Sequence, residues 1–92
     1  MKKILINIKS DLSKINDEFL EQLIEHATED LLISIVGEGC SFLEDIVDEI
    51  YTVKERKFYL VSTSHPNETL EEVKSFVESF KGSGKQYAYY EL

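Results

Sequence analysis

The sequence predicts an α/β fold, a small doubly wound and mostly parallel four-stranded sheet with helices on both faces (β-α-β-α-β-α-β). Three runs of Ile, Leu, Val and aromatic residues have the continuous hydrophobicity of strands that are buried on both faces. Between them, apolar residues recur at every third or fourth position, which is typical of amphipathic helices. Strands that alternate with helices favour right-handed crossovers and a parallel sheet. At 92 residues the chain is expected to form a single α/β domain, residues 1–92.

The first half of the chain predicts two strands with one helix between them. Residues 3–9 are expected to form the first strand. Residues 15–27 carry one apolar stripe of a helix, and Asn16 is its expected N-cap. The β-branched run over residues 31–36 predicts a second buried strand, which a glycine turn at residues 37–39 ends.

The middle of the chain predicts a short helix and the third strand. Residues 41–48 place four apolar side chains on one side and are expected to be helical. Residues 50–53 are expected to be a short extended segment. Residues 58–63 predict the third strand, and Pro66 prevents it from continuing.

The last helix and the last strand follow from short-range signals. Thr69 and Glu72 have the spacing of a capping box, although Asn67 is a competing N-cap. The tyrosine-rich residues 87–92 predict a final strand at an edge of the sheet, in either orientation.

The net charge of −8 is unevenly distributed along the chain. Between Lys14 and Lys54 there is no Lys or Arg. The resulting negative field opposes binding to nucleic acid and favours fast, salt-sensitive association with a basic protein. The alternative is a surface that only keeps the protein soluble. The carboxylates of this stretch are Asp17, Glu18, Glu21, Glu25, Glu29, Asp30, Glu38, Glu44, Asp45, Asp48 and Glu49.

Acidic side chains and tyrosines are the expected partner-binding residues. Tyr87 and Tyr89 share one face of the last strand and Tyr90 takes the other. Tyrosine is common at the centre of protein interfaces, but these side chains serve equally well to complete the core. The terminal strand also offers an edge for a homo-oligomer. The expected set is Glu18, Glu21, Glu25, Glu44, Asp45, Asp48, Glu49, Tyr87, Tyr89 and Tyr90.

Cys40 and His65 are the main candidates for chemistry, although no catalytic residue is expected. They follow the second and third strands and so belong to the same rim of the sheet. A Cys beside a His at a helix N-terminus is the arrangement that activates a thiol. If the second and third strands are neighbours, the two side chains can meet. If the first strand lies between the other two, Asp11 is the more favoured neighbour of each. The alternatives are a cysteine that only fills the core and a histidine that anchors its loop.

Neither a metal nor a cofactor is expected. Gly37 and Gly39 lack the third glycine of a dinucleotide-binding turn, and His26 has no second His or Cys at ligand spacing. The lone Cys40 allows no internal disulfide. The N-terminal apolar run is too short for a signal peptide or a membrane span, so the sequence predicts a cytoplasmic protein that does not bind a membrane.

Several short motifs together resemble a family of small, uncharacterised bacterial α/β proteins. Gly37-Glu38-Gly39-Cys40 is similar to its Gly-Pro-Gly-Cys turn, residues 45–49 to its Asp-Glu helix, and Ser62-Thr63-Ser64-His65 to its Thr-Thr-Trp-His turn. Residues 69–72 match its Leu-Glu-Glu helix. Glu38 and Ser64 depart from the family's Pro and Trp. The resemblance covers most of residues 3–80, and it implies the fold and marks Cys40 and His65 without implying an activity.

In size, acidity and lack of catalytic motifs the chain is also similar, as a class, to immunity proteins of bacterial toxin systems. Such proteins bind and block a basic toxin, often a nuclease domain. The sequence therefore predicts a small acidic binding protein that neutralises a basic protein partner, most simply a toxin immunity protein and not an enzyme. The alternative is a small enzyme or ligand-sensing domain that uses the rim at Cys40 and His65.

Overall fold

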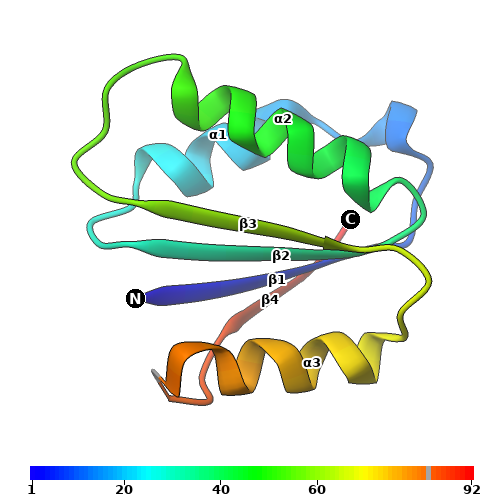
Figure 1. Cartoon of the computed structure of the whole chain (residues 1–92). Coiled ribbons are helices and arrows are strands. Elements are labelled where there is room, and N and C mark those ends of the chain that lie inside the picture. The colour runs from blue at the N-terminus through cyan, green and yellow to red at the C-terminus, as the bar shows by residue number, and fades with distance from the viewer. Residues whose placement is uncertain (83) are drawn as a thin grey trace.

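Four parallel strands form one sheet in the order β3-β2-β1-β4 (Figure 1). The computed structural model describes residues 1–82 and 84–92. The strands are β1 (Lys2–Ile8), β2 (Leu31–Gly37), β3 (Leu60–His65) and β4 (Ala88–Glu91). The predicted α/β class is confirmed. The last strand lies at an edge, as expected, and it is parallel to its neighbour.

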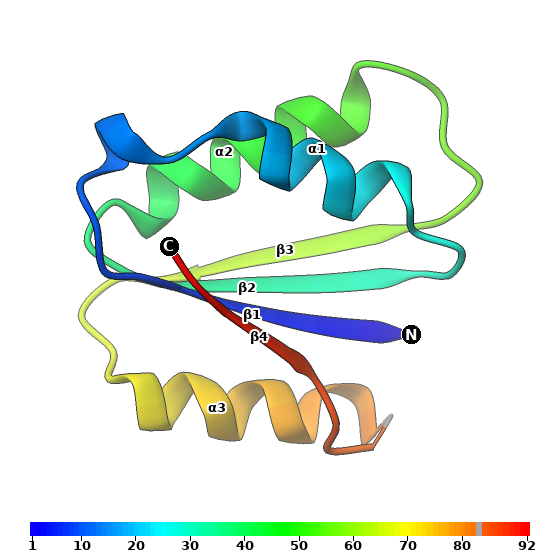
Figure 2. The ribbon, with the colours of Figure 1, turned by 180° about the vertical axis from the view of Figure 1, so that it is seen from behind.

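Helices cover both faces of this sheet (Figures 1 and 2). One face carries α1 (Asp17–Glu25) and α2 (Cys40–Thr52), and the other carries α3 (Leu70–Ser79). Two short 3₁₀ turns, η1 (Leu12–Lys14) and η2 (Phe80–Gly82), follow β1 and α3. The connection from β3 to β4 runs through α3 on the opposite face and takes the chain back across the sheet. β4 therefore pairs with the edge of β1 that β2 does not use.

The helix ends follow local chemistry. The Asn16 side chain accepts a hydrogen bond from the Glu18 N–H at 2.8 Å, which confirms it as the N-cap of α1. The capping box of Thr69 and Glu72 is also confirmed at α3. Asn67 is not a cap; it takes a left-handed backbone conformation in the preceding turn, with φ of 68°.

The expected extended segment at residues 50–53 is wrong, because α2 continues to Thr52. Ile46 and Ile50 continue the apolar stripe of the helix and pack against the core. The Arg56 guanidinium donates to the carbonyls of Ile50 and Tyr51 at 2.9 and 3.3 Å, and so stabilises the end of the helix. The apolar spacing of Ile46 and Ile50 is therefore a signal for this extension in the sequence, and Arg56 adds a stabilising contact from outside the helix.

Candidate functional site

A groove of about 410 Å³ lies between α1 and α2 on the outer side of the two-helix face. Its acidic wall from α1 consists of Asp17, Glu21 and Glu25, which are spaced four residues apart and therefore share one stripe of the helix. The wall from α2 consists of residues that also recur at three- and four-residue steps. Arg56 lies at one end of the groove. The α2 side is Ile46, Glu49, Ile50 and, directly after the helix, Val53.

The groove combines charge with exposed apolar surface. Ile46 and Ile50 are half-buried and pack on the core beneath. Val53 is 75% exposed and adds apolar surface to the groove. Carboxylates thus stand at the sides of a partly apolar surface, an arrangement that resembles the apolar centre and polar rim of a protein interface.

Glu25 closes one end of this groove. Its carboxylate accepts from Arg56 Nη1 at 2.8 Å and pairs with Lys54 Nζ at 2.9 Å. These hydrogen bonds, first that of Arg56 and then that of Lys54, hold the pKa of Glu25 below its ordinary value. Because Arg56 also binds the end of α2, Glu25 fastens α1 to α2 and keeps the two walls together.

The other carboxylates of the groove have no cationic partner. Within residues 1–82 and 84–92, no Lys, Arg or His forms an ion pair with Asp17, Glu21 or Glu49. Glu18 and Asp45 are exposed on the same two helices outside the groove lining. Asp17 was not among the expected binding residues, although its spacing from Glu21 would have identified it.

Glu44 and Asp48 point away from the groove, toward β3. Their carboxylates lie 3.0 and 2.5 Å from the hydroxyl of Ser62. The acidic residues predicted for partner binding therefore divide between two surfaces. One is the groove with its surroundings, and the other is the boundary between α2 and the outer strand.

Tyr89 and Tyr90 of β4, and Tyr87 directly before this strand, lie apart from the groove. Tyr90 faces α1 and packs edge-on against Phe19, with ring centroids 5.0 Å apart. Tyr87 packs with the core under α3. Tyr89, which is 38% exposed, accepts a hydrogen bond from the Asn7 amide at 2.9 Å. Of these three tyrosines, the structure therefore uses Tyr87 and Tyr90 to complete the core and leaves Tyr89 exposed.

Cys40 and His65 line one hollow of about 510 Å³ at the rim, but their side chains belong to opposite faces of the sheet. Cys40 begins α2 and is buried in the core beneath α1 and α2. His65 lies on the α3 face, where its ring packs against Phe76 at 4.8 Å. No hydrogen bond joins the thiol to the imidazole among the described residues.

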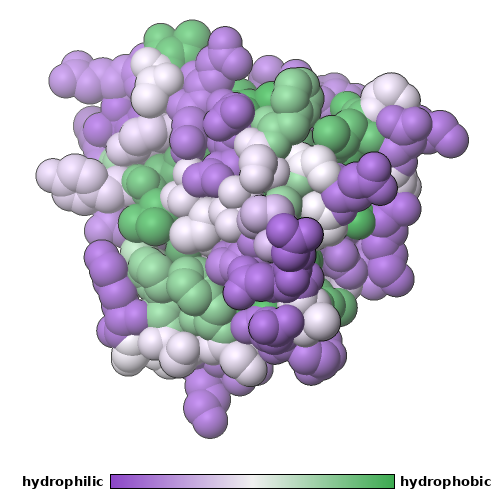
Figure 3. Space-filling view, turned by 45° about the vertical axis from the view of Figure 1, so that its right-hand side comes forward, coloured by the Kyte–Doolittle hydropathy of each residue, from purple (hydrophilic) through white to green (hydrophobic). Residues whose placement is uncertain are grey.

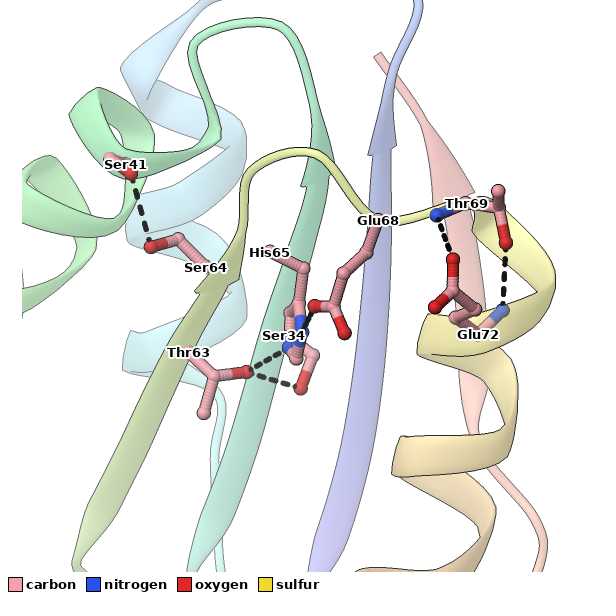
Figure 4. A network of polar contacts seen from close by, with 8 residues as sticks. All are labelled: Ser34, Ser41, Thr63, Ser64, His65, Glu68, Thr69 and Glu72. Carbon is pink, nitrogen blue, oxygen red and sulfur yellow. Dashed lines mark hydrogen bonds and ion pairs between the residues drawn. The ribbon is translucent and has the colours of Figure 1, made fainter.

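Both ring nitrogens of His65 have other partners (Figure 4). Nδ1 pairs with the Glu68 carboxylate, and Nε2 lies 2.8 Å from Thr63 Oγ1. The Thr63 hydroxyl lies 2.7 Å from that of Ser34, which is fully buried. The chain Glu68–His65–Thr63–Ser34 fastens the loop after β3 to the sheet and satisfies a buried hydroxyl. This contact set agrees with the alternative in which His65 anchors its loop.

Asp11 lies at another part of the rim, in a hollow with Glu38. It caps η1 by accepting from the Ser13 N–H at 3.0 Å, and that hydrogen bond lowers the pKa of Asp11. The adjacent glycine turn serves close packing. A Cβ at Gly39 would lie 2.3 Å from Leu12 Cδ1, and one at Gly37 would lie 2.5 Å from the Ile8 carbonyl oxygen.

Comparison of the chain with models of protein families, with curated proteins and with solved structures finds no match. The resemblance to the small bacterial family and the likeness to immunity proteins therefore stay predictions. Over residues 1–82 and 84–92, none of the helices has the length and apolar character needed to cross a membrane. The same residues contain no cluster of three His, Cys, Asp or Glu side chains suited to a metal ion.

Proposed function

We propose that the protein binds and neutralises a basic protein partner through the groove between α1 and α2. The observation that carries this proposal is the pairing of unpartnered carboxylates with exposed apolar surface in one groove. Asp17, Glu21 and Glu49 are available for Lys or Arg side chains of a partner. Ile50 and Val53 offer apolar contact between them.

The division of labour between charge and apolar area follows general interface physics. Long-range attraction between a chain of net charge −8 and a basic surface raises the association rate and makes it salt-sensitive. Apolar contact at the centre of the interface then slows dissociation. The Glu25–Arg56 contact favours this mode of binding, because it holds both walls in place before the partner arrives.

The particular role that we propose is that of a bacterial toxin immunity protein acting in the cytoplasm. A toxin nuclease needs a basic surface to hold phosphates, and an acidic inhibitor competes for that surface. The lone, buried Cys40 suits a reducing compartment. The proposal requires no cofactor and no direct contact with nucleic acid or membrane.

The test is a pull-down with the tagged protein from its native host at two salt concentrations, read by mass spectrometry. The double variant Glu21→Lys/Glu49→Lys reverses charge inside the groove. Glu38→Lys/Glu71→Lys makes the same change in net charge on other exposed surfaces and is the matched control. We expect a basic protein to be captured by the wild type and the control and lost with the groove variant.

The captured protein then allows the mechanism to be measured. We expect the groove variant to slow its association by about tenfold or more at low salt, with a smaller difference at high salt. An equal effect of the control variant would assign the attraction to net charge alone. No effect of the groove variant would show that the partner binds elsewhere.

A further inference from the structure

The outer edge of β3 is open. β3 pairs with β2 along its whole length and with no other strand in the described part of the chain. Figure 1 shows α2 and α3 above and below β3, with neither helix crossing in front of its edge. From Leu60 to Ser64 the strand contains no proline and no charged residue, the usual features that prevent pairing at an edge.

The hydrogen bonds to β2 identify which backbone groups of β3 have no partner strand and point to the open edge. The Tyr59 carbonyl accepts from the Leu31 N–H at 2.9 Å, so the groups of Tyr59 face β2. Backbone groups of successive strand residues point to alternate edges, and therefore the N–H and C=O of Leu60, Ser62 and Ser64 point outward. These groups form a ready-made ladder for one more strand.

Acidic side chains flank this ladder on the α2 side. Glu44 and Asp48 direct their carboxylates to the Ser62 side chain and have no ion-pair partner in residues 1–82 and 84–92. Four residues of helix span about 6 Å, and alternate residues of a strand are about 6.8 Å apart. Two successive side chains on one face of an added strand would thus reach both carboxylates.

Apolar side chains flank the ladder on the α3 side. The helix packs on β1 and β2 and leaves Val61 half-buried. Phe76 and Phe80 of α3 and η2 are also only partly buried against the core. Figure 3 shows hydrophobic surface between the level of β3 and α3. The opposite face of an added strand would cover this surface.

We infer that the β3 edge binds an extended basic segment of a protein partner as a fifth strand of the sheet. Alternate Lys or Arg side chains of the segment face Glu44 and Asp48, and the intervening apolar side chains lie over Val61 and Phe76. A second copy of the chain is the less suitable occupant, because it would bring its own carboxylates to the same edge and carries a net charge of −8. The inference goes beyond the proposed function, since this surface is separate from the groove.

The probe for the test is a short peptide of alternating Lys and Val with blocked ends. NMR amide shifts and hydrogen exchange of the ¹⁵N-labelled protein report where it binds. We expect the largest shifts at residues 60–65 and slower exchange at the amides of Leu60, Ser62 and Ser64. The first control is the same peptide with N-methyl groups on alternate residues, which removes the peptide N–H groups that would donate to the β3 carbonyls. The second control is a peptide of alternating Glu and Val, which reverses the charge. Both should bind at least about tenfold more weakly.

Two variants of one residue separate the backbone from the side chain. Ser62→Pro removes an outward N–H that the β2 ladder does not use, and proline is tolerated at such edges. We expect it to weaken binding of the Lys/Val peptide by about tenfold or more, whereas Ser62→Ala keeps the N–H and binds within about threefold of wild type. If Ser62→Pro fails to fold, the N-methylated peptide still decides the question.

Three results would overturn the inference. One is peptide binding that N-methylation does not weaken. Another is a set of amide shifts that lies on α1 and α2 and disappears with Glu21→Lys/Glu49→Lys; it would assign the peptide to the groove. The third is a dimer of the protein alone in light scattering that Ser62→Pro dissociates, because it would make a second copy the occupant.

Discussion

The face of the sheet under α1 and α2 buries apolar side chains alone among the described residues, whereas the face under α3 also buries polar ones. The buried polar residues are Lys3, Asn7, Ser34 and His65. All four lie on the α3 face. Lys3, Asn7 and Ser34 are each two positions along a strand from an apolar residue of the core under α3, and His65 packs against Phe76 of that helix. One sheet therefore has a continuous apolar core on one side and a mixed core on the other.

The two faces differ in how much of the sheet's width their helices cover. Four strands about 4.8 Å apart span about 14 Å between the outer strand axes, and one helix is about 10 Å across. Two helices cover such a face, while α3 alone packs on β1 and β2. The buried polar side chains of this face come from β1, β2 and the end of β3, and no buried side-chain N or O in the described residues lacks a hydrogen bond. The single helix thus leaves the α3 side of β3 only partly covered, next to the edge that no other described strand pairs with.

A pair of valines tests this difference in cover, with the largest expected effect. Val47→Ala removes a fully buried side chain on the two-helix face and should lower the free energy of unfolding by about 2–3 kcal/mol. Val61→Ala is the same change at a half-buried site on the other face and should cost less than about 1 kcal/mol. Urea unfolding measures both. Equal losses would mean that α3 covers β3 as well as α2 does.

Lys3 provides the next test, because it is the buried charge of the mixed face. Its ammonium donates to the carbonyl of Val77 at 2.7 Å, at the negative end of α3, and to that of Gly84 at 2.6 Å, in the segment beyond the helix. Lys3→Met fills the same space but removes the charged donor from both carbonyls, of which Val77 keeps the Phe80 N–H, and we expect a loss of about 2 kcal/mol in unfolding free energy. Lys2→Met, at an exposed neighbouring position, should change stability by less than about 0.5 kcal/mol. If Lys3→Met left the free energy of unfolding unchanged, α3 would not depend on the contact from Lys3 of β1.

The polar network on β3 gives the smallest expected effect, and a double-mutant cycle can measure it. Thr63→Val keeps the shape of the side chain but removes the partner of both the buried Ser34 hydroxyl and His65 Nε2, and should cost about 1 kcal/mol or more. Adding Ser34→Ala removes one of these two unsatisfied groups, so the double variant should be more stable than the two single losses together predict. Additive losses in thermal unfolding would mean that the two hydroxyls act independently.

The sequence carried enough information for most of the secondary structure. Continuous apolar runs predicted β1 and β2, because strands covered on both faces exclude water from both sides. The periodic stripes and the caps at Asn16 and Thr69 predicted the helices, since those signals depend only on neighbours along the chain. The end of α2 was missed although Ile46 and Ile50 continue its apolar stripe; the contacts that fix this end come from Arg56, which lies outside the helix and donates to the carbonyls of its last turn.

The candidate surfaces depended on contacts that no local pattern encodes. The acidic stripe of α1 was visible in the sequence, but the groove exists because the crossovers place α1 and α2 side by side on one face. In β3 the run Ser62-Thr63-Ser64 has no apolar alternation, so the sequence left open which face His65 would take.

By itself, then, the sequence determined the α/β class, the helices and strands near their true positions, and the concentration of negative charge on α1 and α2. Only the tertiary structure decided that β4 joins β1, that Cys40 and His65 lie on opposite faces, and that β3 is left with an open edge. The reason is physical: local propensities act over a few residues, whereas strand order and cover are set by how whole layers of the fold bury their apolar faces together.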